Sequence, residues 1–178
     1  MSGLSEAKQF AHDWIDQNRQ RLSDFDLEIW RYAEPAWREY HSARAYVDLL
    51  RHEGFDVEEG SGEMPTAFLA TWGTSGPVIG SYAEYDAVPA NSQQPVPYQA
   101  AREGLHPYAA GHTDPHSMLG VGALAGFLAA KAALDKFGID GQLRFFGEPA
   151  EKVCGSKPVY AAKGYYDGAD AFIAPTTR

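Results

Sequence analysis

The chain has 178 residues, 44% hydrophobic and 22% charged, which is typical of one globular domain with a buried core. The net charge of −9 without a basic run argues against nucleic-acid binding, and the single cysteine, Cys154, excludes an internal disulfide. Because residues 1–9 do not resemble a signal peptide and no stretch approaches the roughly 20 apolar residues of a membrane span, we expect a cytoplasmic protein without a membrane partner.

The first third of the chain is predicted to be helical. Apolar residues at helical spacing predict a helix over 5–22 and a second helix that begins near 24–26 and is interrupted by Pro35. A third helix is expected over about 39–54, where a glycine ends the pattern.

Strands and helices alternate in the remainder. Short strands are expected over 55–59, 67–72 and 77–85, followed by a long segment over 89–111 without periodicity. The expected elements after it are a helix over 117–137, a strand over 142–146, a helix over 157–163 and a strand over 169–174. This order predicts an α/β fold: a three-layer sandwich in which a mixed, mostly parallel sheet has helices on both faces.

The segment 111–117 carries two imidazoles and a carboxylate. Pro115 disfavours helix at Asp114, so His112, Asp114 and His116 are expected to project to one side of an extended stretch. Nitrogen and oxygen donors suit Zn²⁺ or Mn²⁺. The alternative is a polar turn with Ser117 as the helix N-cap.

Four acidic residues follow predicted strands. Glu84 and Asp86 come after the strand over 77–85, and Glu148 and Glu151 come after the strand over 142–146. Sites in open α/β sheets lie beyond the carboxyl ends of the strands. The acids are therefore expected near the histidines, although each one alone is equally consistent with ordinary surface charge.

Several motifs recur in the order of a known family. Asp-Ala-Val-Pro at 86–89 is similar to its Asp-Ala-Leu-Pro, and Asp-Pro-His-Ser-Met-Leu-Gly-Val-Gly at 114–122 to its Cys-Gly-His-Asn-Leu-Leu-Gly-Val-Gly. Pro-Ala-Glu-Lys at 149–152, Gly-Tyr-Tyr-Asp-Gly-Ala-Asp at 164–170 and the segment 34–39 also have counterparts. The chain thus resembles the catalytic domain of M20 metallopeptidases and amidohydrolases, in the branch of aminobenzoyl-glutamate hydrolases and N-acyl amino acid amidohydrolases.

That resemblance implies a metal-dependent amidohydrolase that uses one or two Zn²⁺ or Mn²⁺ ions on a small N-acyl or aryl-amide amino acid conjugate. It implies that Asp114 replaces a bridging cysteine, that His116 and Glu84 are metal ligands, that Asp86 supports the centre, and that Glu151 is the general base.

The departures from the family pattern leave alternatives open. Lys152 stands where the family has a second glutamate ligand; as a cation it is expected to pair with Asp114 instead. Glu148 is the predicted replacement ligand and His112 the predicted substrate-binding residue. Cys154 is either a substitute ligand or a small buried hydrophobe.

The family's members are much longer than this chain and contain a lid and dimerisation domain. We therefore interpret residues 1–178 as part of a catalytic domain, completed by a longer polypeptide, by a second chain, or within a homo-oligomer. The alternative function is a non-catalytic, M20-like binding or regulatory subunit without a full metal site.

Overall fold

A computed structural model describes residues 5–175, and a five-stranded mixed sheet organises it. The strand order is β1-β2-β4-β3-β5, in which β4 pairs in parallel with β3 and antiparallel with β2, and β5 is parallel to β3. All five predicted strands are present: β1 (Asp56–Glu59), β2 (Phe68–Trp72), β3 (Val78–Ala83), β4 (Gln142–Gly147) and β5 (Ala171–Ile173).

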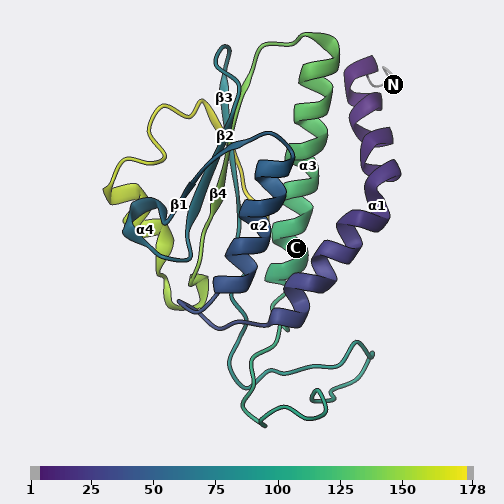
Figure 1. Cartoon of the computed structure of the whole chain (residues 1–178), viewed down its shortest axis with the longest axis vertical. Helices are drawn as coiled ribbons and strands as arrows, with labels where there is room; N and C mark the ends of the chain where they lie inside the picture. Colours follow the sequence, from purple (N-terminus) through teal and green to yellow (C-terminus); the bar gives the residue numbers. More distant parts are fainter. Residues whose placement is uncertain (1–4, 176–178) are drawn as a thin grey trace.

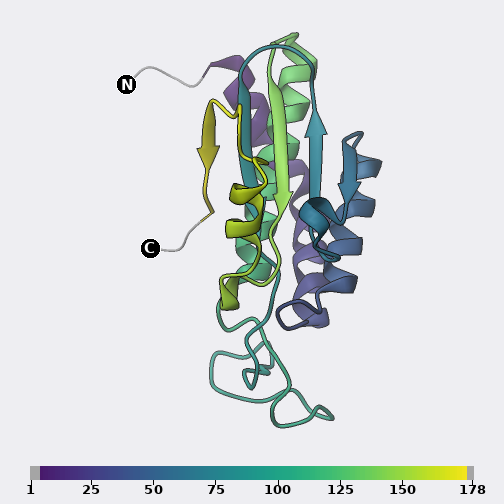
Figure 2. The same ribbon diagram turned by 90° about the vertical axis from the view of Figure 1, so that its left-hand side faces the viewer.

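Helices cover both faces of the sheet, which confirms the predicted α/β class. In Figures 1 and 2, α2 and α3 lie on one face, α1 lies outside α3, and α4 lies on the opposite face. The α-helices are α1 (Glu6–Tyr32), α2 (Tyr40–His52), α3 (His116–Phe137) and α4 (Ser156–Ala162), and two short 3₁₀ helices are η1 (Ser61–Glu63) and η2 (Glu151–Val153).

The two helices predicted over 5–22 and from 24–26 onward are one continuous helix, α1. Leu22, Phe25 and Ile29 are all buried on one side of it, so packing against the core carries the helix through the polar residues that suggested a new start. The helix ends at Ala33, which has a left-handed backbone (φ 45°), two residues before Pro35.

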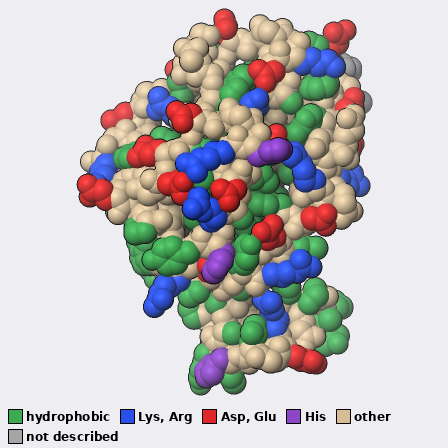
Figure 3. All heavy atoms as spheres, viewed as in Figure 1, with side chains coloured by type: hydrophobic (Ala, Val, Ile, Leu, Met, Phe, Trp, Pro, Cys, Tyr) green, Lys and Arg blue, Asp and Glu red, His purple; other side chains and the backbone are tan. Residues whose placement is uncertain are grey.

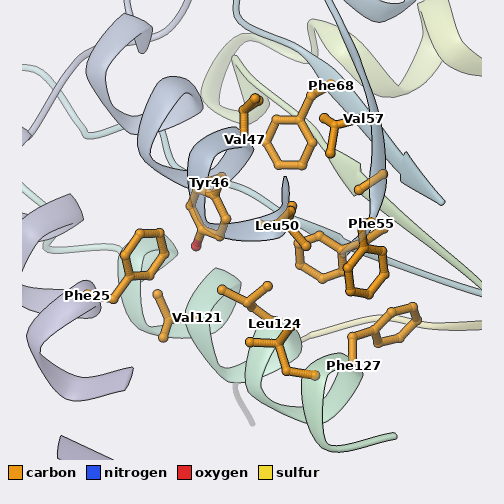
Figure 4. Close-up of a cluster of buried hydrophobic side chains, with 14 of the residues drawn as sticks. Phe25, Tyr46, Val47, Leu50, Phe55, Val57, Phe68, Val121, Leu124 and Phe127 are labelled. Atoms are coloured by element: carbon orange, nitrogen blue, oxygen red, sulfur yellow. The ribbon is translucent and has the colours of Figure 1, made fainter. Parts of the chain in front are cut away.

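The core lies between the sheet and the helices on its α2–α3 face. Figure 4 shows aromatic and aliphatic side chains from α1, α2, α3 and the strands meeting there. Tyr46 from α2 stacks on Phe68 from β2, with ring centroids 5.9 Å apart, and Phe127 from α3 packs against Phe145 from β4.

Helix α3 approaches the sheet closely at Gly120. A Cβ atom there would lie 2.6 Å from the Tyr46 hydroxyl and 2.8 Å from the Glu84 carbonyl oxygen, whereas one at Gly122 would meet nothing within 4 Å. The absence of a side chain at Gly120 therefore lets the first turn of α3 lie against the carboxyl end of β3.

By length and composition, α3 is apolar enough to cross a membrane, so the expectation that no such stretch exists was wrong. Its contacts are those of a core helix, because it packs against α1, β3 and β4. Ser117 lies inside α3 rather than at its N-cap, which is Pro115.

The segment between β3 and α3 leaves the body of the molecule as a long loop, as expected for 89–111 (Figure 1). Backbone hydrogen bonds between Val88 and Gly111 close its neck.

Charges of both signs are interspersed on the face shown in Figure 3 and do not form a basic patch there. Between α2 and β1, for example, Arg51 pairs with Glu59 at 2.6 Å.

Candidate metal site

Three chain segments meet at one edge of the sheet. Because β3 and β4 are parallel, with Ala83 opposite Gly147, the residues that follow both strands emerge side by side. Glu84 and Asp86 follow β3, and Glu151 follows β4. Helix α3 begins at the same edge with His116, so the predicted meeting of the histidine motif with the strand-end acids is present in the structure.

Asp86 fixes the orientation of the His116 ring. His116 Nδ1 lies 2.9 Å from Asp86 Oδ1, and the backbone N–H of Lys152 donates to Asp86 Oδ2 at 2.9 Å. Burial raises the pKa of the fully buried Asp86, but these hydrogen bonds outweigh it and lower the pKa below its usual value. The carboxylate is therefore an acceptor only, so Nδ1 carries the proton and Nε2 points away from Asp86.

His116 Nε2 faces the other acids. It lies 3.4 Å from Glu84 Oε2, 3.4 Å from Glu151 Oε2 and 3.8 Å from Asp114 Oδ2. Burial lowers the pKa of His116, but its hydrogen bond to Asp86 and the surrounding carboxylates outweigh this effect and raise it.

The arrangement fits a divalent ion. Ligand atoms of Glu84, His116 and Glu151 all lie within 4.8 Å of one another. Nitrogen and oxygen ligands about 2.1 Å from one tetrahedral ion lie about 3.4 Å from each other. This is the distance from His116 Nε2 to both carboxylates. An imidazole oriented by a carboxylate is also the usual arrangement around a metal-binding histidine.

Two lysines hold the acids in pairs. Lys152 Nζ contacts Asp114 Oδ2 and lies 3.0 Å from Glu151 Oε2. Lys157 Nζ, from α4, contacts Glu84 Oε1 and lies 3.0 Å from Glu148 Oε2. Partial burial lowers the pKa of each lysine, but the paired carboxylates outweigh it and raise the pKa, so both remain cations at neutral pH.

Glu148 is near the group of possible ligands but is not part of it. The side chain is 1% exposed, and the Tyr166 hydroxyl donates to its Oε1 at 2.6 Å. Burial raises the pKa of Glu148. Lys157 and Tyr166 together hold its carboxyl group away from His116 Nε2, so its predicted role as a replacement ligand stays a prediction.

His112 is not among the clustered ligand atoms, although His116 and Asp114 lie close enough to affect its pKa. Its ring is buried, and among residues 5–175 neither ring nitrogen has a hydrogen-bond partner in normal geometry, although the Ile29 carbonyl faces it. Burial, with a smaller effect of His116, lowers the pKa of His112 to about 4. The ring is therefore neutral at physiological pH, and its predicted substrate-binding role is untested.

Sequence reasoning missed several residues that shape the site. Lys157 and Tyr166 were not considered, and neither was Glu39, a buried acid that accepts the Ala150 N–H at 2.8 Å. That bond holds the turn before Glu151, where Ala150 has a left-handed backbone (φ 60°). Only the acidic side chain of Glu39 at the start of a helix offered a signal.

Cys154 is exposed, so its reading as a buried hydrophobe was wrong, and it is not among the clustered ligand atoms.

Comparisons with known proteins identify relatives of the chain. No family model matches the chain. It is 34% identical over 170 residues to one of the subunits of the p-aminobenzoyl-glutamate hydrolase of Escherichia coli, covering 96% of the chain and 35% of that protein. It is 31% identical to thermostable carboxypeptidase 1 of Saccharolobus solfataricus, covering 89% of the chain and 37% of that protein.

A crystal structure of a dinuclear metal-binding peptidase of the M20 family from Bacillus subtilis has the same fold, with a TM-score of 0.72 at 20% identity. The match covers 89% of this chain and 43% of that one. The chain is thus an M20-like protein related to the aminobenzoyl-glutamate hydrolases, and it spans about a third of the length of the curated relatives it matches.

Proposed function

We propose that the protein carrying this chain is a metal-dependent amidohydrolase. The observation that carries the proposal is the position of His116 Nε2, 3.4 Å from both Glu84 and Glu151, on a ring whose other nitrogen is bound to Asp86. His116 and Glu84 would hold one Zn²⁺ or Mn²⁺ ion, and Glu151 would lie beside that ion. The bound ion would polarise the substrate carbonyl and acidify a water molecule.

The side chains of the site divide the remaining tasks. Asp86 keeps the Nδ1 proton in place, which leaves the lone pair of His116 Nε2 free for the ion. Glu151, about one-third exposed, is open to a water molecule and is the proposed proton acceptor, which later returns the proton to the leaving amine. Lys152, 3.0 Å from Glu151, forms an ion pair with that acid.

The substrate class follows from the relatives. One of them is named as part of a p-aminobenzoyl-glutamate hydrolase, so an aryl-amide conjugate of an amino acid is the proposed substrate. The full native protein, supplied with Mn²⁺ or Zn²⁺, should release p-aminobenzoate from p-aminobenzoyl-glutamate. Glu151→Gln should lower kcat by about 10²- to 10⁴-fold with the metal still bound. Glu103→Gln, in the exposed loop, is the matched control.

The ion pairs of Lys152 and Lys157 favour a second candidate function, that of a non-catalytic binding subunit. Lys152 and Lys157 each occupy two carboxylates that would otherwise be free to bind metal. Metal analysis of the protein purified without chelator separates the two functions. A bound ion that disappears in His116→Ala supports the enzyme, whereas a folded protein that takes up no Zn²⁺ or Mn²⁺ supports the non-catalytic alternative.

We further propose that a second chain packs against this one. Strand β5 is an exposed edge, and an apolar groove of about 740 Å³ runs along α3 beside it. The Escherichia coli relative is named as one subunit of its hydrolase, which suggests assembly with another chain. A homo-oligomer is the alternative, and the mass and composition of the native complex in solution separate the two. The expected cytoplasmic location stays a prediction.

A further inference from the structure

We propose that this site binds one divalent cation rather than two, and that the ammonium group of Lys152 takes the position of the second. The inference rests on the proposed metal-dependent function and refines it. The Bacillus subtilis relative is a dinuclear metal-binding peptidase, whereas Lys152 stands here where the resemblance implies a second acidic ligand.

Lys152 already occupies the place between two of the acids around His116. Its Nζ contacts Asp114 Oδ2 and lies 3.0 Å from Glu151 Oε2. The sequence resemblance places Asp114 where the family has a bridging cysteine. A cation that needs both carboxylates would have to displace the ammonium group that already pairs with them.

The position of Lys152 is also fixed by its own backbone. The Lys152 N–H donates to Asp86 Oδ2 at 2.9 Å, which is the carboxylate that orients His116. The residue lies in η2, directly after Glu151. The backbone of Lys152 is thus held by the same carboxylate that orients His116, which keeps its ammonium group next to the site.

One position remains suitable for an ion. His116 Nε2 makes no hydrogen bond among the described residues, and the His116 side chain is 4% exposed. It faces Glu84 and Glu151 at the spacing of ligands around one ion. Glu84 contacts Lys157 through Oε1, which leaves Oε2 directed to His116. The geometry therefore offers ligands for one divalent ion, next to the ammonium group of Lys152.

The test counts bound ions on the full native protein. After equilibrium dialysis against Zn²⁺ or Mn²⁺, plasma mass spectrometry should give one ion per chain for the wild type. Lys152→Glu, which removes the cation and adds a ligand, should give two. Lys152→Met, which removes the cation without adding a ligand, should stay at one. Electron paramagnetic resonance of the Mn²⁺ forms should show an isolated ion in the wild type and a coupled pair in Lys152→Glu.

Each contrary result has a distinct meaning. Two ions on the wild type would overturn this inference and leave the proposed amidohydrolase intact. A single ion on Lys152→Glu, with an unchanged circular dichroism spectrum, would show that the lysine is not what excludes the second ion. No ion on a folded wild type would overturn the proposed metal-dependent function itself.

Discussion

At the scale of single residues, the candidate metal site depends on a carboxylate that orients a ligand but would not itself bind the metal. Asp86 is fully buried and accepts from both His116 Nδ1 and the backbone of Lys152. A neutral amide in its place would still fit, but it no longer stabilises the tautomer that frees Nε2. Replacing Asp86 by asparagine should therefore lower the affinity for the metal without changing the fold.

We expect Asp86→Asn to weaken Zn²⁺ or Mn²⁺ binding by about 10- to 100-fold, the usual effect of losing a carboxylate that supports a metal-binding histidine. Isothermal titration calorimetry measures the affinity. Asp135→Asn, on the exposed end of α3, removes an acid at a distance and should leave the affinity unchanged. Equal affinities for wild type and Asp86→Asn would contradict the assigned role.

At the scale of secondary-structure elements, Glu34 caps the N-terminus of α2, although the residue itself lies before the helix. Its Oε1 accepts the His41 N–H and its Oε2 accepts the Ser42 N–H, each at 2.9 Å. Glu34→Ala should therefore cost about 1 kcal/mol of unfolding free energy at pH 7, as for other lost caps. Glu103→Ala, in the exposed loop, should cost nothing measurable.

The same contact predicts a pH dependence. Burial raises the pKa of Glu34, but the hydrogen bonds to its carboxylate outweigh burial and lower the pKa below 4.5. A depressed pKa in the folded state means that the stabilisation is present above 4.5 and is lost as the pH falls through the folded value. Urea unfolding at pH 7 and pH 3 should show the difference between wild type and Glu34→Ala shrinking. A constant difference would contradict the ionised cap.

In the first turns of α3, two glycines of similar sequence context should respond in opposite directions to alanine. Gly120→Ala places a methyl group against the Tyr46 hydroxyl and the Glu84 carbonyl, so it should destabilise by about 1–3 kcal/mol. Gly122→Ala meets open space and should gain up to about 1 kcal/mol of helix propensity. Thermal unfolding compares the two, and equal shifts would show that α3 does not approach β3 so closely.

These elements also mark how far the sequence alone predicts the structure. The five strands and α2, α3 and α4 follow from alternation and helical spacing, which are local properties. The continuity of α1 depends on burial against α3, and the Lys157 contact to Glu84 spans 73 residues of sequence. Neither leaves a local signal, because each arises from packing between elements distant in the chain.

At the scale of the whole molecule, α3 has an apolar surface that the described residues do not fully cover. Only 44% of its most apolar stretch is buried, and the exposed part, with Met118 and Gly126, lines the groove together with Ile173 of β5. Exposed apolar patches of this kind usually mark an interface. The groove lies on the face of the sheet opposite α4, so it is separate from the α4 lysine that contacts the metal site.

A charge in this groove should therefore disrupt assembly without unfolding the chain. Gly126→Asp adds a carboxylate where nothing lies within 4 Å, so the fold has room for it. Light scattering after size exclusion should show a lower mass for the variant than for the native protein, with an unchanged circular dichroism spectrum. Ala161→Asp, on the exposed side of α4, is the matched control and should keep the native mass.

The result also identifies what covers α3. If a second chain packs there, Gly126→Asp lowers the mass because a carboxylate is costly to bury without a partner. If another part of the same polypeptide packs there, the mass stays constant and the melting temperature falls instead. No change in either quantity would mean that the groove is open to solvent in the native protein, and that the apolar face of α3 serves only the packing already present.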